Sequence, residues 1–337
     1  MKISRRQFVK AMAAMSAASM LAACGGNSGS GSSGGKKALT FQIWDVAQKE
    51  GMEAMCAAYT QQHPEVSIEV QVTSWNEYWT KLEAAATSNQ MPDIFWMHTN
   101  EILKYADNGM LADCSDIVEK DKFSEISLSN AMGSNGTLYA VPKDKDTVGL
   151  VYNKEMFDAA GVAYPDENWT WDDLVSASEK IYAATGKYGY MAYADDQLGY
   201  WNFVYQAGGY ILNEDKTKAG FTQPATEKAM KFYIGLQQND WCPDQTYFAE
   251  TAPGTAFFSE KGAMFLEGDW NILAELQNYP EMVGKWDVAV LPKCPDPESG
   301  DGRATISNGL CYATAASNKN LDTVKDILKF FGSEEGQ

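Results

Sequence analysis

Leu39-Thr-Phe-Gln-Ile-Trp44 decides the fold class, because a short, largely apolar run of this kind predicts a buried β-strand. Alternating elements follow along the chain, predicted as a helix over 51–62, a strand over 66–72, a helix over 76–88, a strand over 92–97 and a helix over 101–108. This repeated strand–helix order predicts a mostly parallel sheet covered by helices, which is an α/β fold.

After Tyr139-Ala-Val-Pro142 the pattern starts again. Thr170 and Asp173 have the spacing of a capping box, which predicts the start of a helix running to 184. The remaining elements are predicted as strands over 148–152, 286–291 and 304–314, and as helices over 154–160, 201–207, 225–239, 269–277 and 321–331. The chain of 337 residues is long enough for two domains beyond its first segments.

The first residues indicate export. A basic stretch is followed by an Ala- and Met-rich run over 11–23, which is too short to span a bilayer and predicts a signal peptide over 1–23. Ser4-Arg-Arg-Gln-Phe-Val-Lys10 resembles a twin-arginine export signal, and an ordinary basic region remains the alternative.

Leu21-Ala-Ala-Cys24 resembles a bacterial lipobox, in which the cysteine thiol carries a diacylglycerol anchor. A plain secretory signal with an incidental cysteine is the alternative. The following residues are almost all Gly and Ser, so 24–37 is predicted to be a flexible tether. We therefore expect lipidation at Cys24 and an extracytoplasmic location at the cell membrane.

Composition excludes several classes of protein. Hydrophobic residues make up 45% of the chain and charged residues 21%, as in globular proteins. The net charge of −18 argues against nucleic-acid binding, which needs a basic face. Beyond Cys24 the cysteines are scattered without a CxxC pair, and there are only two histidines, so we predict no metal site and no cofactor.

Ten short blocks, in this order and spacing, resemble the solute-binding proteins of ABC importers, in the maltose-binding-like sugar branch. They are FQIWD (41–45), MPDIFWM (91–97), YADNGML (105–111), YAVPKDKDT (139–147), VYNKEMF (151–157), NWTWDDL (168–174), KGAMF (261–265), GDW (268–270), VAVLP (288–292) and SNG (307–309). Together the blocks cover nearly all of 38–337.

The resemblance implies a two-lobed, periplasmic-binding-protein-like fold with a hinge. Lobe one would comprise 38–142 and 293–337, and lobe two 143–292. Relatives of this type continue beyond the position of Gln337, so the resemblance also implies that the C-terminal part of lobe two is missing. Its function would be to capture a carbohydrate between the lobes and deliver it to the permease subunits of the importer, without enzymatic activity.

Ligands of open α/β sheets bind beyond the carboxyl ends of the strands. Trp44 and Asp45 end the first strand, and His98 and Asn100 follow the strand over 92–97. An aromatic ring can stack on the apolar face of a sugar, and a carboxylate or amide can bind its hydroxyls. We therefore predict that these four residues contact the ligand.

Other candidates come from the resemblance, which implies that the chain crosses between the lobes near 142–147 and again near 291–293. Asp144 and Asp146 lie where both lobes could reach a ligand, while a surface or hinge ion pair is the alternative for each. By resemblance, Trp270 would be a stacking ring and Asn308 would line the cavity. The weaker candidates are Trp75, Tyr200, Trp201 and Arg303. For each aromatic residue, packing in the core is the competing interpretation.

Two rival functions remain open. The same scaffold could bind a solute that is not a sugar, such as a polyamine or a peptide, and acidic residues without stacking rings would favour a polyamine. A secreted glycosidase would need two carboxylates on either side of the scissile bond. Aspartate and glutamate are abundant, but nothing else in the sequence points to such a pair.

Overall fold

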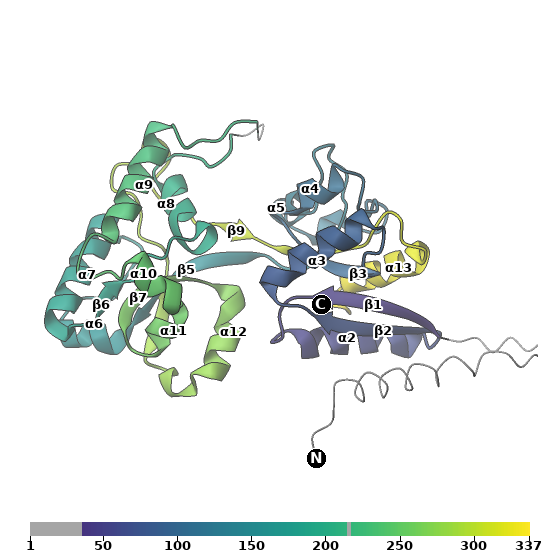
Figure 1. The fold of residues 1–337 in the computed structure, drawn as a ribbon, viewed down its shortest axis with the longest axis horizontal. Helices are drawn as coiled ribbons and strands as arrows, with labels where there is room; N and C mark the ends of the chain where they lie inside the picture. Colours follow the sequence, from purple (N-terminus) through teal and green to yellow (C-terminus); the bar gives the residue numbers. More distant parts are fainter. Residues whose placement is uncertain (1–35, 214–216) are drawn as a thin grey trace, which may run out of the picture. The chain divides into compact units, whose positions relative to one another are not determined.

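Two separate β-sheets organise the chain (Figure 1). The computed structural model describes residues 36–213 and 217–337. The predicted signal peptide, the lipidation site Cys24 and nearly all of the tether therefore lie outside the described residues. Within the described part of the chain, no helix is both long enough and apolar enough to cross a membrane.

The first sheet has the strand order β2-β1-β3-β10-β4. Its strands are β1 (Lys37–Ile43), β2 (Val66–Val72), β3 (Ile94–His98), β4 (Val141–Pro142) and β10 (Leu310–Ala313). Strands β1 and β3 are parallel, with Phe41 opposite Ile94. Strand β10 is antiparallel to both of its neighbours, with Tyr312 opposite Trp96 on β3 and opposite Val141 on β4.

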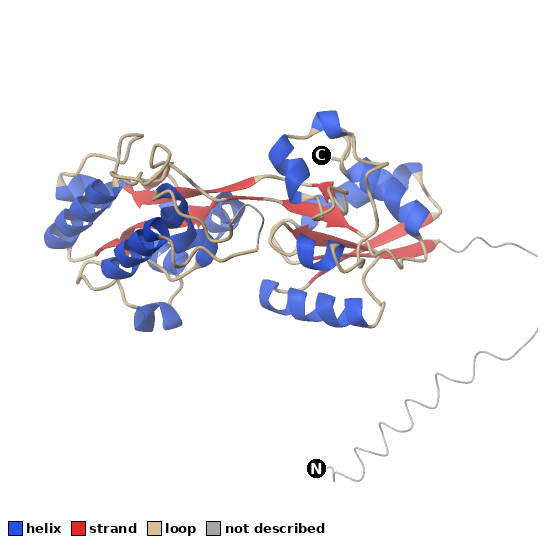
Figure 2. Cartoon of the chain, turned by 90° about the horizontal axis from the view of Figure 1, so that it is seen from above, coloured by secondary structure: helices blue, strands red, loops and turns tan. Residues whose placement is uncertain are grey.

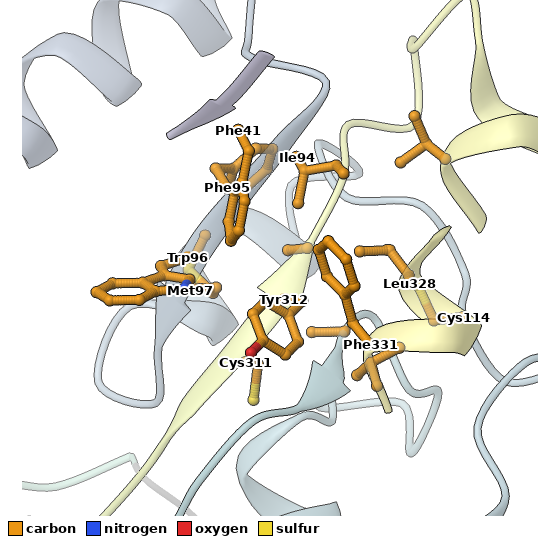
Figure 3. Close-up of a cluster of buried hydrophobic side chains, with 14 of the residues drawn as sticks. Phe41, Ile94, Phe95, Trp96, Met97, Cys114, Cys311, Tyr312, Leu328 and Phe331 are labelled. Carbon is orange, nitrogen blue, oxygen red and sulfur yellow. The ribbon is translucent and has the colours of Figure 1, made fainter. Parts of the chain in front are cut away.

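The helices of the first half pack on this sheet. They are α2 (Lys49–Gln62), α3 (Trp75–Thr87), α4 (Ile102–Ala106), α5 (Glu125–Asn130) and α13 (Leu321–Phe331). The first half also contains the short helix η1 (Lys120–Lys122), which buries no residue. Figure 3 shows Tyr312 of β10 beside Phe331 of α13, and their ring centroids are 5.1 Å apart. Phe41 of β1 contacts both rings, so strands and helices that are far apart in sequence share one aromatic core.

The second sheet has the strand order β6-β7-β5-β8. Its strands are β5 (Asp146–Asn153), β6 (Tyr188–Tyr190), β7 (Gly262–Gly268) and β8 (Trp286–Ala289). Side chains alternate between the faces of a strand, so Leu150 and Val151 enter different hydrophobic clusters. A sheet with a core on each face needs helices on both sides, and Figure 2 shows helices on either side of the strands.

The helices of the second half include two with clear local signals. Helix α6 (Lys154–Ala160) ends at Gly161, which adopts the left-handed conformation with φ of 62°. Helix α7 (Trp171–Thr185) starts with the predicted capping box, in which Thr170 and Asp173 bond each other's backbone N–H. The others are η2 (Asp196–Tyr200), α8 (Trp201–Gln206), α9 (Pro224–Leu236), α10 (Gln245–Glu250), α11 (Pro253–Phe258), α12 (Asp269–Asn278) and η3 (Pro280–Met282).

The direction of the strands differs from the sequence prediction. A mostly parallel sheet was expected, but β10 runs antiparallel in the first sheet, and β5 is antiparallel to both β7 and β8 in the second. The alternation of strands and helices predicts where strands lie, whereas pairing direction depends on segments that join the sheet from far along the chain. Strand β10, for example, inserts beside β3 more than two hundred residues later.

The chain passes between the two sheets along a pair of extended segments. It leaves the first sheet after Pro142 and enters the second with β5. It returns through β9 (Ser307–Asn308), which lies beside β5 in Figure 1. Strand β9 pairs antiparallel with the start of β5, so that Asn308 lies opposite Asp146. The resemblance implied a return near 291–293, whereas Cys294 and Ile306 pack in the core of the second half.

Candidate functional site

A cavity of about 360 Å³ lies among residues from both halves of the fold. That size is within the range of about 300–1,000 Å³ that is typical of small-molecule sites. Seven of the predicted ligand residues line it, namely Trp44, Asp45, Trp75, His98, Asp146, Trp270 and Asn308. Six further residues that were not predicted complete the lining, namely Gln48, Asp195, Gln197, Leu198, Asn271 and Leu310.

The ends of strands position most of the predicted side chains. Trp44 and Asp45 directly follow β1, and His98 is the last residue of β3, its parallel neighbour. Parallel strands end at the same edge of a sheet, so these three residues meet there. On the other side of the cavity, Trp270 lies in the first turn of α12, directly after β7.

Trp44 is held in a cluster of aromatic rings. Its ring centroid lies 4.9 to 5.1 Å from those of Trp75, Tyr78 and Trp96, each in an edge-to-face arrangement. Trp75 is 41% exposed. Core packing and cavity lining were competing interpretations of Trp44, and the structure shows both, because a half-buried ring can serve each role.

The indole of Trp270 lies against the backbone of Gly268. A Cβ atom placed on Gly268 would come within 2.3 Å of that ring. The backbone of Gly268 has φ of −87°, which any residue can adopt. The glycine is therefore needed here for space rather than for conformational freedom.

The carboxylate of Asp45 is fixed by two donors. The backbone N–H of Ala47 donates to Oδ1 over 2.8 Å, and Nε2 of Gln48 donates to Oδ2 over 2.9 Å. Neither donor is a cation. Each oxygen keeps acceptor capacity that can serve a hydroxyl group in the cavity.

His98 is a buried, neutral imidazole. Burial lowers the pKa of His98 to about 4, although the nearby Asp144 partly opposes this shift. The backbone N–H of Asn100 donates to Nδ1 over 3.2 Å, so the proton of the neutral ring lies on Nε2. His98 can therefore offer a single N–H donor to a neutral ligand without introducing a charge.

Asp146 has an unusually weak acid group. Burial raises the pKa of Asp146 to about 7, and repulsion from Asp144 and Asp269 adds to the shift, while Lys143 opposes it. Among the described residues the carboxylate of Asp146 has neither a hydrogen bond nor an ion pair. The hinge ion pair that was the alternative interpretation is made instead by Asp144, with Lys143.

A family model for bacterial extracellular solute-binding proteins matches residues 44–337. The chain belongs to this family. A relative from Bacillus subtilis, named an arabinooligosaccharide-binding protein, is 27% identical over 94% of this chain and 74% of its own. The diacetylchitobiose-binding protein DasA of Streptomyces coelicolor is 25% identical over 97% of this chain and 78% of its own.

A solved structure agrees with this solute-binding protein in fold. The substrate-binding protein of an ABC transporter from Listeria monocytogenes, in complex with cycloalternan, superimposes with a TM-score of 0.77 at 24% identity. The match covers 89% of this chain and 76% of the Listeria chain. The fold is thus the two-lobed α/β fold of solute-binding proteins.

Three of the six lining residues that sequence reasoning missed lie at η2, namely its N-cap Asp195 and its residues Gln197 and Leu198. Asn308, which is 4% exposed, donates from its amide to Oε1 of Gln197. Asp195 caps η2 by accepting from the N–H of Leu198 over 2.7 Å, and burial is the main cause that raises its pKa. No sequence pattern marks η2 as a site. The one local signal is the residue type of Asp195, since aspartate is favoured at the N-cap of a helix.

Five predicted ligand residues lie outside the lining of this cavity. Tyr200 and Trp201 pack against the core of the second half, and Arg303 donates to the backbone oxygen of Glu167. Asp144 accepts from the N–H of Leu310 and pairs with Lys143, and Asn100 offers its N–H to His98. Asp144 and Asn100 thus support residues that line the cavity.

The lining of the cavity provides rings, acceptors and a few donors, but no lysine or arginine. In the described part of the chain, no group of three or more histidine, cysteine or acidic side chains could hold a metal ion. The site of this solute-binding protein is thus suited to holding a hydroxyl-rich or cationic small molecule by stacking and hydrogen bonding.

Proposed function

We propose that this protein captures a carbohydrate in the cavity and delivers it to the permease subunits of an ABC importer. The observation that carries the proposal is the lining itself, in which Trp44, Trp75 and Trp270 occur with hydroxyl-binding carboxylates and amides. A sugar needs both kinds of group, because it presents an apolar C–H face and a rim of hydroxyls. Relatives are named for arabinooligosaccharides, diacetylchitobiose and lactose, which supports a mono- or oligosaccharide ligand.

The protein acts by hinge closure around the ligand. The first lobe contains the sheet β2-β1-β3-β10-β4 and the second the sheet β6-β7-β5-β8, with lobe boundaries near Pro142 and at β9. Contacts that the sugar makes only when the lobes are closed shift the equilibrium toward the closed form. The family consists of binding proteins, and we propose no chemical step.

Anchoring completes the proposal. The lipobox at Cys24 would attach the protein to the outer face of the cell membrane, where the importer lies. Mass spectrometry of membrane-extracted protein tests this directly. A diacylglycerol adduct on Cys24 supports the anchor, and an unmodified thiol in mature protein contradicts it.

A cationic solute such as a polyamine is a second candidate. Three carboxylates line the cavity, from Asp45, Asp146 and Asp195, and no lysine or arginine does. The three indole rings offer flat surfaces to the apolar face of a sugar, but ammonium groups also bind over indole faces, so the rings alone do not separate the two candidates. The relatives named for sugars favour the carbohydrate. A titration can separate these ligands.

The decisive experiment is a calorimetric titration of the soluble form against matched ligands. The panel contains arabinooligosaccharides, diacetylchitobiose, lactose and maltotriose, together with spermidine. We expect saturable heat with at least one sugar and its loss in Trp270→Ala. Binding of spermidine alone would support the second candidate, and the release of reducing ends from an oligosaccharide would indicate an enzyme.

A further inference from the structure

Lys143 is a buried cation next to the cavity. It follows β4, where the chain leaves the first sheet, and its backbone N–H donates to the carbonyl oxygen of Leu310 over 2.8 Å. Its side chain is only 9% exposed. A buried ammonium group is costly unless its donors are satisfied, so its partners are expected to be specific.

Three partners surround the ammonium group. Nζ forms an ion pair with Oδ2 of Asp144, donates to Oε1 of Gln48 over 2.9 Å, and lies 4.9 Å from the ring centroid of Trp96. These partners come from the crossing segment, from the start of α2 and from β3. Lys143 therefore joins the crossing to two elements that carry cavity residues.

The contact with Gln48 fixes the orientation of its amide. Because Oε1 accepts from Lys143, the amide nitrogen must point the other way, where Nε2 lies 2.9 Å from Oδ2 of Asp45. A flipped amide would place its oxygen against the carboxylate of Asp45 and its NH₂ group against the ammonium group of Lys143. Both contacts would then be repulsive. The charge of Lys143 thus selects the amide orientation that holds Asp45.

Two further contacts reach the cavity lining. Trp96, beneath Lys143, packs edge-to-face on Trp44 with ring centroids 5.0 Å apart. Asp144 uses its second oxygen, Oδ1, to accept from the N–H of Leu310 over 2.7 Å. Trp44 and Leu310 both line the cavity, as does Asp45.

We propose that Lys143 is the positioning residue of the sugar site, holding Asp45 through Gln48 and linking it to the crossing between the lobes. The inference rests on the proposed function. A change in the crossing segment during hinge closure moves Lys143, and with it the hydrogen bond that orients the acceptor of the sugar hydroxyl. Asp45 is therefore set in place by the crossing that closes the site.

The test compares Lys143→Met with Lys145→Met, which removes the same charge from an exposed position on the same segment. The ligand is the sugar that titrates best in the panel above. We expect Lys143→Met to weaken its binding by about tenfold to a hundredfold, because a charge-assisted hydrogen bond is lost from the chain. Lys145→Met should stay within about twofold of the parent, since rim charges contribute little.

A double-mutant cycle with Asp45→Asn separates positioning from general damage to the fold. If Lys143 acts through Asp45, Lys143→Met should weaken binding much less in the Asp45→Asn background than in the parent. Equal weakening in both backgrounds would overturn the proposal. Denaturant unfolding of each variant records any change in stability separately.

A crystal structure of ligand-free Lys143→Met decides the matter even if no sugar binds. We expect the Gln48 amide to turn and the Asp45 carboxylate to lose its single position. An unchanged Gln48–Asp45 hydrogen bond in that variant would overturn the proposal. If no sugar bound to the parent protein, that result would contradict the proposed function. The crystal structure would still decide whether Lys143 holds Gln48 and Asp45 in place.

Discussion

Gly268 and the indole of Trp270 approach each other so closely that a single added methyl group would displace the ring. The ideal Cβ position on Gly268 lies 2.3 Å from three ring atoms of Trp270. The backbone conformation of Gly268 suits alanine, so the strain in Gly268→Ala comes from the contact of the added methyl group with this ring, which supplies its three nearest atoms. It is therefore a selective means of moving the ring.

We predict that Gly268→Ala weakens sugar binding by about tenfold or more, because Trp270 can no longer present the same face to the cavity. Calorimetric titration measures the change. Gly235→Ala is the matched control, since Gly235 lies in α9 with open space where its Cβ would be. That control should raise stability by about 0.5–1 kcal/mol and leave binding unchanged. Full affinity in Gly268→Ala would show that Trp270 does not contact the sugar.

Asp146 provides a prediction about pH. The pKa of its carboxyl group is about 7 in the folded protein, above the ordinary value of 3.8, because of burial and the nearby carboxylates. The folded state therefore binds this proton more tightly than the unfolded state does. The resulting stability is fully present below about pH 4 and is lost as the pH rises through about 7.

Asp146→Asn replaces the carboxyl group by a neutral amide of the same shape and removes this dependence. Its melting temperature should rise relative to that of the parent protein as the pH goes from 4.5 to 8. Paired thermal melts across that range measure the difference, so contributions from all other groups cancel. A difference that stays constant with pH would contradict the raised pKa of Asp146.

The capping box of α7 is a test of local stability. The hydroxyl of Thr170 accepts from the N–H of Asp173 and donates to its carboxylate over 2.7 Å, and that carboxylate accepts from the N–H of Thr170. Thr170→Ala should lower the free energy of unfolding by about 1 kcal/mol, as measured in urea. Thr60→Ala, which loses only a solvent-exposed hydrogen bond from its hydroxyl to the carbonyl oxygen of Ala57 in α2, should change it by less than about 0.5 kcal/mol.

We predict that the thiols of the described cysteines react only when the protein unfolds. All five are free and buried, and burial raises the pKa of Cys56, Cys114 and Cys242 to about 12. The thiolate is the reactive form, so these groups should resist a disulfide reagent at pH 8. In a form that begins at Lys36, labelling should appear only with denaturant. Fast labelling of the native protein would indicate an accessible thiol.

Local signals predicted several elements of the fold to the residue. The helix over 154–160 has Gly161 as its stop, and the helix over 321–331 has one apolar face that enters the core. Strand direction could not be predicted this way, because β10 takes its place between β3 and β4 through contacts that are remote in sequence. Periodicity describes which face of an element is buried, not which partner lies beside it.

The residues that line the cavity also differ in how far the sequence predicted them. Trp44, Asp45 and His98 were predicted because the carboxyl ends of strands are recognisable from sequence. Gln197 and Leu198 belong to η2, which has no periodic signal and enters the lining only through tertiary packing. Tyr200 and Trp201, which follow closely, carry the more suggestive side chains but pack, partly buried, against the core of the second half.

Trp75 and Trp79 allow the stacking role to be separated from core packing. Both lie on α3 and both contact Trp44, but Trp75 lines the cavity while Trp79 packs only against the core of the first half. Trp75→Ala should reduce the free energy of sugar binding by about 1–2 kcal/mol, because its exposed ring is free to stack, and should change stability little. Trp79→Ala should show the reverse pattern, with about 2–3 kcal/mol lost from the free energy of unfolding.

Titration calorimetry and urea unfolding of the two variants measure both quantities. If the two variants lost affinity and stability in the same proportion, the ring cluster would act as one structural unit, and the assignment of Trp75 to the ligand would fall.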